Sequence, residues 1–292
     1  MKLLAKFNLI LVLVIGTGVF LIAQLAYSFL MGNARREVMD QAQLMLESAQ
    51  SVRDYTQNDL SPLLKQNPQH KVHFLAETVP AFAATTTFSK LRTNYPDYTY
   101  KEATLNPTNP EDRAGDWEAD VIRELREHPE LQQKTGERPT ADGASIFLAK
   151  PIVAGPPCME CHSTPAAAPK AMLTVYGSNN GFGWKTNEIV GARIISVPMS
   201  VPVKIATDAW HSLLAILIGT GIAIILALDA GVFWFVIHPL RLVSETADQV
   251  SKGERNIAPL PVKGKDEIAS VTASFNRMQV SLAKALKMLD ES

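Results

Sequence analysis

Cysteine is scarce in this sequence, and neither sign of charge is in excess. The chain has 292 residues and only 2 cysteines, too few for the framework of several disulfides found in small secreted proteins. The formal net charge is −1, from 28 basic and 29 acidic residues, so there is no basic surplus for binding nucleic acid. Hydrophobic residues make up 47% of the chain, which excludes an intrinsically disordered protein.

Charge is missing altogether from two long segments, of which the first lies near the N-terminus. An uncharged, apolar run of 25 residues extends from Phe7 to Met31. A membrane span needs about 20 predominantly apolar residues, so residues 1–34 are predicted to hold an N-terminal transmembrane helix. A cleaved signal peptide is the alternative, but the run is about twice as long as a usual signal core and no A-x-A site follows it.

The second uncharged segment begins at Ala209 and ends at Leu228, and apolar sequence resumes after Asp229. Its length predicts a second transmembrane helix over residues 209–237. An ionisable group in the apolar layer is costly unless it faces a partner or water. A position near the lipid headgroups is the simplest interpretation of Asp229, and its role is left open.

Residues 35–208, between the two spans, are numerous enough for a folded domain. An apolar stripe over residues 38–52 continues the first membrane helix, and residues 117–128 have the pattern of an amphipathic helix. Runs rich in branched and aromatic residues predict strands. We therefore expect an α+β domain with an antiparallel sheet. The four predicted strands are 98–105, 144–153, 171–176 and 188–199.

One motif carries recognisable chemistry, the sequence C-x-x-C-H from Cys158 to His162. This spacing is that of c-type haem attachment, in which Cys158 and Cys161 form thioethers with the porphyrin and His162 is the proximal iron ligand. A zinc site needs about four ligands, and the chain has no third cysteine. A thioredoxin-type pair is expected at a helix start, whereas this one follows Gly-Pro-Pro. A plain disulfide would leave His162 unexplained, so one covalent haem c is predicted.

The sequence does not fix the second axial ligand of the iron. His70 and His73 lie in one short stretch, and His128 and the methionines are further possibilities. His73 is the distal candidate that we retain. An apolar pocket that leaves the iron open to a gas is equally compatible with the sequence.

The haem motif also predicts the orientation in the membrane. In bacterial cells haem is attached to such motifs on the outer side of the energised membrane, so residues 35–208 are predicted to be periplasmic and both termini cytoplasmic. The distribution of positive charge does not decide the matter, because Lys2 and Lys6 precede the first span while Arg35 and Arg36 follow it.

Residues 238–292, after the second span, contain two apolar stripes whose spacings alternate between three and four. Parallel helical bundles bury such seams between subunits. Gly253 is expected to end the first helix, and Asp266 with Glu267 supplies the negative charge favoured at the start of the second. The stripes comprise Leu240, Val243, Ala247 and Val250, then Ile268, Val271, Phe275, Met278, Leu282, Ala285 and Leu289.

Two known families resemble this chain at these residues. Pro239 after the membrane helix, the Gly253 connector and Asp266-Glu267-Ile268 resemble a HAMP domain, which implies a dimeric, parallel four-helix bundle over Pro239 to about Leu289. The region from about Ser51 to Met199 resembles the single-haem, PAS-like c-type sensors. This resemblance implies the same haem anchors and proximal ligand, and a distal ligand that varies; one form uses a third cysteine, absent here. Its stretches are 78–88, 100–118, 158–169 and 176–199.

Together these features predict a membrane-anchored PAS-like haem domain followed by an all-α HAMP bundle. A redox or gas-ligand signal would pass through the strand at 188–199 and the second span to a separate output protein, since no output module precedes Ser292. The alternative is an anchored electron-transfer cytochrome c, which needs no cytoplasmic bundle. An enzyme ranks last, because no distal acid–base set can be named. The expected partners are a second copy, membrane lipid, and an output protein or redox partner.

Overall fold

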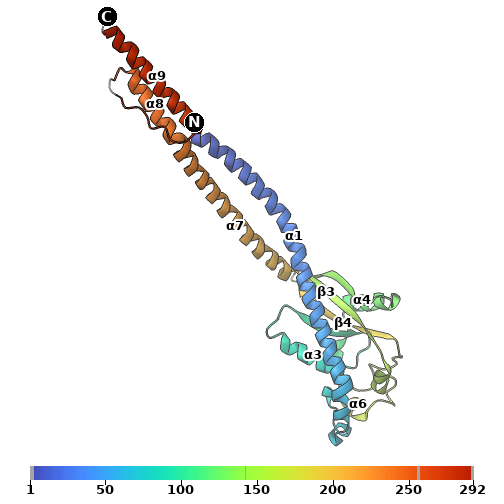
Figure 1. Cartoon of the computed structure of the whole chain (residues 1–292). Helices are drawn as coiled ribbons and strands as arrows, with labels where there is room; N and C mark the ends of the chain where they lie inside the picture. Colours follow the sequence, from blue (N-terminus) through green and yellow to red (C-terminus); the bar gives the residue numbers. More distant parts are fainter. Residues whose placement is uncertain (1–2, 142, 255–256, 291–292) are drawn as a thin grey trace. The chain divides into compact units, whose positions relative to one another are not determined.

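A computed structural model describes residues 3–141, 143–254 and 257–290 of the chain (Figure 1). The chain forms two compact units. One comprises residues 1–26 together with 211–292, and the other comprises residues 27–210. Helix α1, Leu3–Tyr55, contributes to both units as one continuous helix of 53 residues.

Two helical stretches are long and apolar enough to cross a membrane, Leu4–Lys65 and Ser200–Ser251. The second comprises α7 (Ser200–Val232), a π-helical turn η6 (Phe233–Ile237) and α8 (His238–Ser251). Both predicted spans therefore lie within helices of suitable length and composition.

The unit formed by residues 27–210 contains a four-stranded antiparallel sheet in the order β1-β4-β3-β2. The strands predicted near residues 98–105, 144–153 and 188–199 are confirmed. The observed strands are β1 (Thr99–Thr104), β2 (Lys134–Thr140), β3 (Gly143–Val153) and β4 (Ile189–Pro198).

One local prediction in this unit was wrong, and one strand was not predicted. Residues 171–176 form helix α6 (Lys170–Tyr176) instead of a strand, because the segment begins after Pro169 and ends at Gly177, which has φ +76°. Short apolar runs fit either structure by pattern alone. Strand β2 was not predicted, because its sequence KTGERPT is polar; it lies at a sheet edge, where a proline is tolerated.

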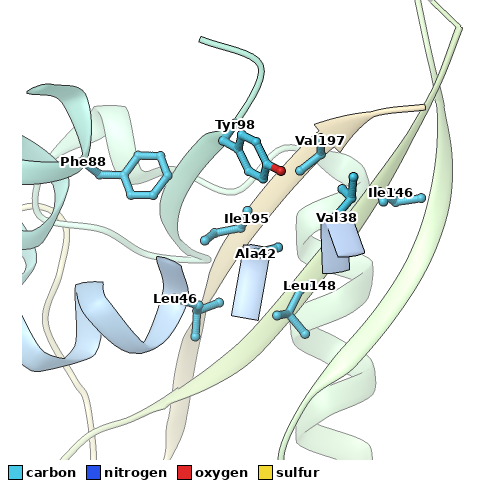
Figure 2. Packing of buried hydrophobic residues seen from close by; sticks show 9 residues of the cluster. All are labelled: Val38, Ala42, Leu46, Phe88, Tyr98, Ile146, Leu148, Ile195 and Val197. Atoms are coloured by element: carbon cyan, nitrogen blue, oxygen red, sulfur yellow. The ribbon is translucent and has the colours of Figure 1, made fainter. Parts of the chain in front are cut away.

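The sheet is covered on both faces by helices that the apolar patterns predict. On one face, the stripe of α1 packs on β3 and β4 (Figure 2). On the other face, α4 (Asp116–Glu127) buries Val121, Ile122 and Leu125. The end of α1 is therefore fixed to the sheet. Figure 2 shows this first cluster, which comprises Val38, Ala42, Leu46, Phe88, Tyr98, Ile146, Leu148, Ile195 and Val197.

Short helices complete this unit around the sheet. They are η1 (Thr56–Leu60), α2 (Ser61–Lys65), η2 (Pro68–Lys71), η3 (Ala76–Thr78), α3 (Pro80–Leu91), η4 (Pro110–Asp112), η5 (Pro156–Cys158) and α5 (Met159–His162).

The two C-terminal helices form as the stripes predict, as α8 and α9 (Glu267–Asp290). Gly253 has φ +79° just after α8, and Asp266 Oδ1 accepts a hydrogen bond of 2.8 Å from the Ala269 N–H at the start of α9. The connector is held by the Asn276 amide, which donates to the Leu260 carbonyl and accepts from its N–H. The side chain of Leu289, the last member of the predicted stripe, lies outside the described residues.

Candidate functional site

The C-x-x-C-H motif folds as a single tight turn. Pro156 opens η5, the Cys158 N–H donates to the Gly155 carbonyl at 3.0 Å, and α5 follows directly. Residues three apart lie on the same side of a helical turn, so Cys158 and Cys161 share one side. Both cysteines are free and half-buried. The two thiols are thus available together to one ligand.

The imidazole of His162 is held in a defined orientation. Its Nδ1 lies 2.7 Å from the Gly181 carbonyl oxygen, and its ring stacks on Trp184 with the centroids 3.9 Å apart and the planes at 10°. Because a carbonyl oxygen only accepts, Nδ1 carries the hydrogen, and Nε2 keeps its lone pair free for a metal.

Burial also favours the neutral form of the His162 ring. Burial lowers the pKa of His162, against the smaller opposing effect of the bond to the Gly181 carbonyl. The neutral imidazole is the form that binds a metal ion. His162 is therefore prepared to ligate in its protonation state as well as in its orientation.

Gly181 occupies a position where the backbone requires glycine. It has φ +83°, a left-handed conformation, and a Cβ at this position would collide with the Thr108 side chain. Its N–H donates to Asn106 Oδ1 at 3.2 Å. The loop is also tied to the motif by backbone bonds from the Trp184 N–H to the His162 carbonyl and from the Gly183 N–H to the carbonyl of Ser163, which follows the motif. This loop consequently fixes the acceptor that orients the imidazole.

The motif forms part of the wall of a cavity of about 1040 Å³. This volume is slightly above the roughly 300–1,000 Å³ that small-molecule and cofactor sites usually have. Two thiols, one metal-binding nitrogen and an apolar wall fit a large, flat, iron-containing cofactor such as a c-type haem. The apolar lining includes Phe74, Phe82, Met172, Tyr176 and Trp184.

A buried charge cluster lines another part of the cavity. Arg53, near the end of α1, forms an ion pair with Glu102 of β1, whose side chain is only 4% exposed. The Tyr100 hydroxyl donates to Glu102 Oε1 at 2.8 Å. Burial first, and then the Glu102 charge, raises the pKa of Tyr100, so its proton stays in this bond. Helix α1 therefore contacts the cavity through a charged group.

Other polar groups face the same space. Lys101 Nζ donates to Glu118 Oε2 at 2.8 Å. Burial, reinforced by the charges of Glu102 and Glu111, raises the pKa of Asp112 to about 6. Among the described residues, the buried Thr104 Oγ1 in the cavity wall has no hydrogen-bond partner. The cavity thus combines an apolar lining with cations, acids and one unsatisfied hydroxyl.

The structure brings together three of the four residues predicted for the site. Cys158, Cys161 and His162 share one wall, whereas His73 is exposed and lies outside the cavity lining, although its neighbour Phe74 belongs to it. A distal role for His73 stays a prediction without support from this arrangement.

The remaining histidine candidates also lie apart from the cavity lining or outside the description. The His70 side chain lies outside the described residues. His128 is exposed at the end of α4 and contacts Glu130 at 3.2 Å. Met172 is a methionine that does line the cavity.

Comparison with known proteins decides the family. Residues 31–198, more than half of the chain, match the family described as Tll0287-like. The chain belongs to the Tll0287-like family. Residues 232–284 match the HAMP domain, so both resemblances seen in the sequence are confirmed. The predicted fold class, a mixed helix-and-sheet domain between two candidate membrane helices with a helical HAMP region after it, is confirmed as well.

This Tll0287-like protein was also compared with curated proteins and with solved structures. No curated protein matches the chain. The crystal structure of the cyanobacterial heme-protein Tll0287 is similar, with a TM-score of 0.44 and 11% sequence identity, and the match covers 56% of this chain and 95% of that one.

Proposed function

We propose that the Tll0287-like domain binds one haem c covalently through Cys158 and Cys161, with His162 as the proximal iron ligand. The observation that carries this proposal is the bond between His162 Nδ1 and the Gly181 carbonyl. It leaves Nε2 free for iron beside two free thiols in the wall of a large cavity. The family takes its description from Tll0287, which is titled a heme-protein, and membership supports the same cofactor here.

The residues of the chain have distinct roles toward this cofactor. Gly181 and Trp184 hold the imidazole of His162 in place, and the apolar lining keeps water from the cofactor faces. Arg53 and Lys101 supply cations on the cavity wall, which suit the carboxylates that a haem carries. When bound, a c-type haem supplies an iron that changes oxidation state and takes up small ligands where an axial position is open.

The second part of the proposal is a sensor in the bacterial cytoplasmic membrane. We place the haem domain in the periplasm and residues 238–292 in the cytoplasm, where the HAMP domain of a dimer relays a redox or gas-ligand signal to an output protein. Helix α1 links a candidate span directly to Arg53 in the cavity wall, and β4 leads into α7. Val271, Met278 and Leu282 of α9 are between 42% and 60% exposed, apolar, and available to a second copy.

The test begins with the cofactor itself. The full chain is produced in bacteria with a working cytochrome c maturation system, and its intact mass is measured. We expect the added mass of one haem, lost in a Cys158→Ser/Cys161→Ser variant and retained in a His128→Ala control. Protein of unmodified mass would exclude the covalent haem.

A second measurement separates the sensor from an electron-transfer cytochrome. The visible spectrum is recorded oxidised, reduced, and reduced with CO, and a cellular output is compared with and without residues 238–292. CO binding and loss of output without the HAMP region support the sensor. A tightly six-coordinate iron with rapid electron exchange, and output that survives the deletion, support the carrier.

A further inference from the structure

The unit formed by residues 1–26 and 211–292 holds one polar contact that the proposed function leaves unexplained. Asn8 Nδ2 of α1 donates to Asp229 Oδ2 of α7 at 2.9 Å. Both side chains are partly buried and lie within the apolar runs of the two spans. The sequence left the role of Asp229 open, and the structure gives it a partner on the other helix.

A second contact places this pair in an extended helix interface. A Cβ at Gly221 of α7 would lie 3.1 Å from Ile15 Cγ2 of α1, so the two helices approach closely there. Ile15 follows Asn8 by seven residues, and Gly221 precedes Asp229 by eight. Seven or eight residues make about two helical turns, and the two steps run in opposite chain directions. The contacts therefore belong to one antiparallel packing seam with a small residue at one point and a polar pair at another.

Each side chain of the polar pair uses only one of its two polar atoms in the bond between Asn8 and Asp229. Among the described residues, Asn8 Oδ1 and Asp229 Oδ1 are both buried without a hydrogen-bond partner. Two apolar side chains would fill this place without leaving buried oxygens unpaired, so the pair is not explained by stability alone. Buried polar residues in helical seams are best known for fixing which register the helices adopt.

We propose that Asn8 and Asp229 form a register clasp, a polar contact that holds the two membrane helices in one axial and rotational alignment. The proposal does not depend on haem, because it concerns only the packing of the two spans. Helix α7 continues through η6 into α8, the first helix of the HAMP region. Any signal that slides or rotates α7 against α1 must first break the clasp, so its strength sets the resting state of the relay.

The close contact between Ile15 and Gly221 provides a way to measure this register. A disulfide forms readily when two Cβ atoms are about 3.5–4.5 Å apart, and an Ile15→Cys/Gly221→Cys pair replaces the two residues that meet in the seam. The full chain carrying this pair is oxidised in native membranes, and the rate of the intramolecular cross-link is followed by electrophoresis. Membrane levels of each variant are checked by immunoblot.

In this background, Asn8→Leu or Asp229→Leu should slow cross-linking about threefold to tenfold, the effect of one hydrogen bond between membrane helices. The double variant should be no slower than either single one, because each change removes the same contact. The exchanged pair, Asn8→Asp with Asp229→Asn, should restore the original rate. Thr17→Val is the matched control, since Thr17 bonds to the Leu13 carbonyl of its own helix.

Three results would overturn the clasp. They are unchanged cross-linking in the Asn8 and Asp229 variants, additive losses in the double variant, and an equal loss in Thr17→Val. If Asp229→Leu does not reach the membrane, Asn8→Ala and Asp229→Ala with the same pair of cysteines decide the question by the same criteria.

Discussion

Two walls of the cavity are built in different ways. The wall that holds His162 consists mainly of one short turn and the loop around Gly181, 19 residues away, with one long-range bond from the Gly181 N–H to Asn106 Oδ1. The wall that holds Arg53 and Glu102 is built from two separate elements, α1 and β1. These two residues are 49 positions apart in the sequence. The first wall is a local device for binding, and the second connects the site to a long helix. Variants at His162, Glu102, Gly181 and Asp112 should distinguish the two kinds of wall.

Removing the imidazole should have the largest effect, and it should be confined to binding. In His162→Ala, thioether attachment can persist, but iron loses its proximal ligand, so the visible spectrum of the oxidised and reduced protein should change completely. His73→Ala is the matched control, because His73 is exposed. A wild-type spectrum in His162→Ala would contradict the assignment of His162.

Breaking the charge cluster should instead weaken the fold. Glu102→Ala removes the buried carboxylate that pairs with the half-buried Arg53 guanidinium, and loss of one partner of a buried pair costs about 3–5 kcal/mol. The free energy of unfolding should fall by about that amount in a denaturant titration. Lys65→Ala is the control, because its pair with Glu160 is exposed and should contribute less than about 1 kcal/mol. Equal losses in both variants would contradict the buried role of Glu102.

Gly181→Ala should disturb the local wall by a smaller amount. The left-handed backbone alone costs of order 1 kcal/mol for a residue with a Cβ, and the collision with Thr108 adds to it. Gly183→Ala separates the two causes, since Gly183 also has φ +83° but open space at the Cβ position. We expect a lower melting temperature and an altered spectrum in Gly181→Ala, and a smaller loss with an unaltered spectrum in Gly183→Ala. Identical behaviour would show that the collision is unimportant.

The pH dependence from Asp112 should be the smallest effect. Its pKa is raised to about 6 in the folded chain, above about 3.9 in an unfolded one, so the folded state binds the extra proton. This contribution is present at pH 4 and is lost as the pH rises to about 6. Solvent screening reduces it to about 1 kcal/mol or less. Asp112→Asn should remove this slope from the unfolding free energy, and Asp97→Asn, an exposed control, should keep it.

Sequence reasoning succeeded where the determining residues are neighbours or follow a regular period. The apolar stripe of α1, the strands β1, β3 and β4, and the two HAMP helices were predicted in this way. The C-x-x-C-H motif was recognised because its residues are contiguous, but its fold as a helical turn over Pro156–His162 was not predicted.

The features that could not be predicted from the sequence are those that depend on contacts between distant residues. Nothing near Arg53 distinguishes it from an exposed arginine until β1 brings Glu102 beside it. The edge strand β2 has no apolar alternation, since it is stabilised by pairing with β3. The partner of Asp229 lies 221 residues away. No local pattern encodes such contacts.

The unbroken length of α1 has one more consequence. At about 1.5 Å per residue, the path along the axis of its 53 residues is about 80 Å. Each inserted or deleted residue would rotate the following side chains by about 100° around the helix axis, so the number of residues between two contact positions of α1 fixes the angle between the side chains that make those contacts. Surface loops of this protein can change length with little penalty, whereas α1 can change only in steps that restore its angle.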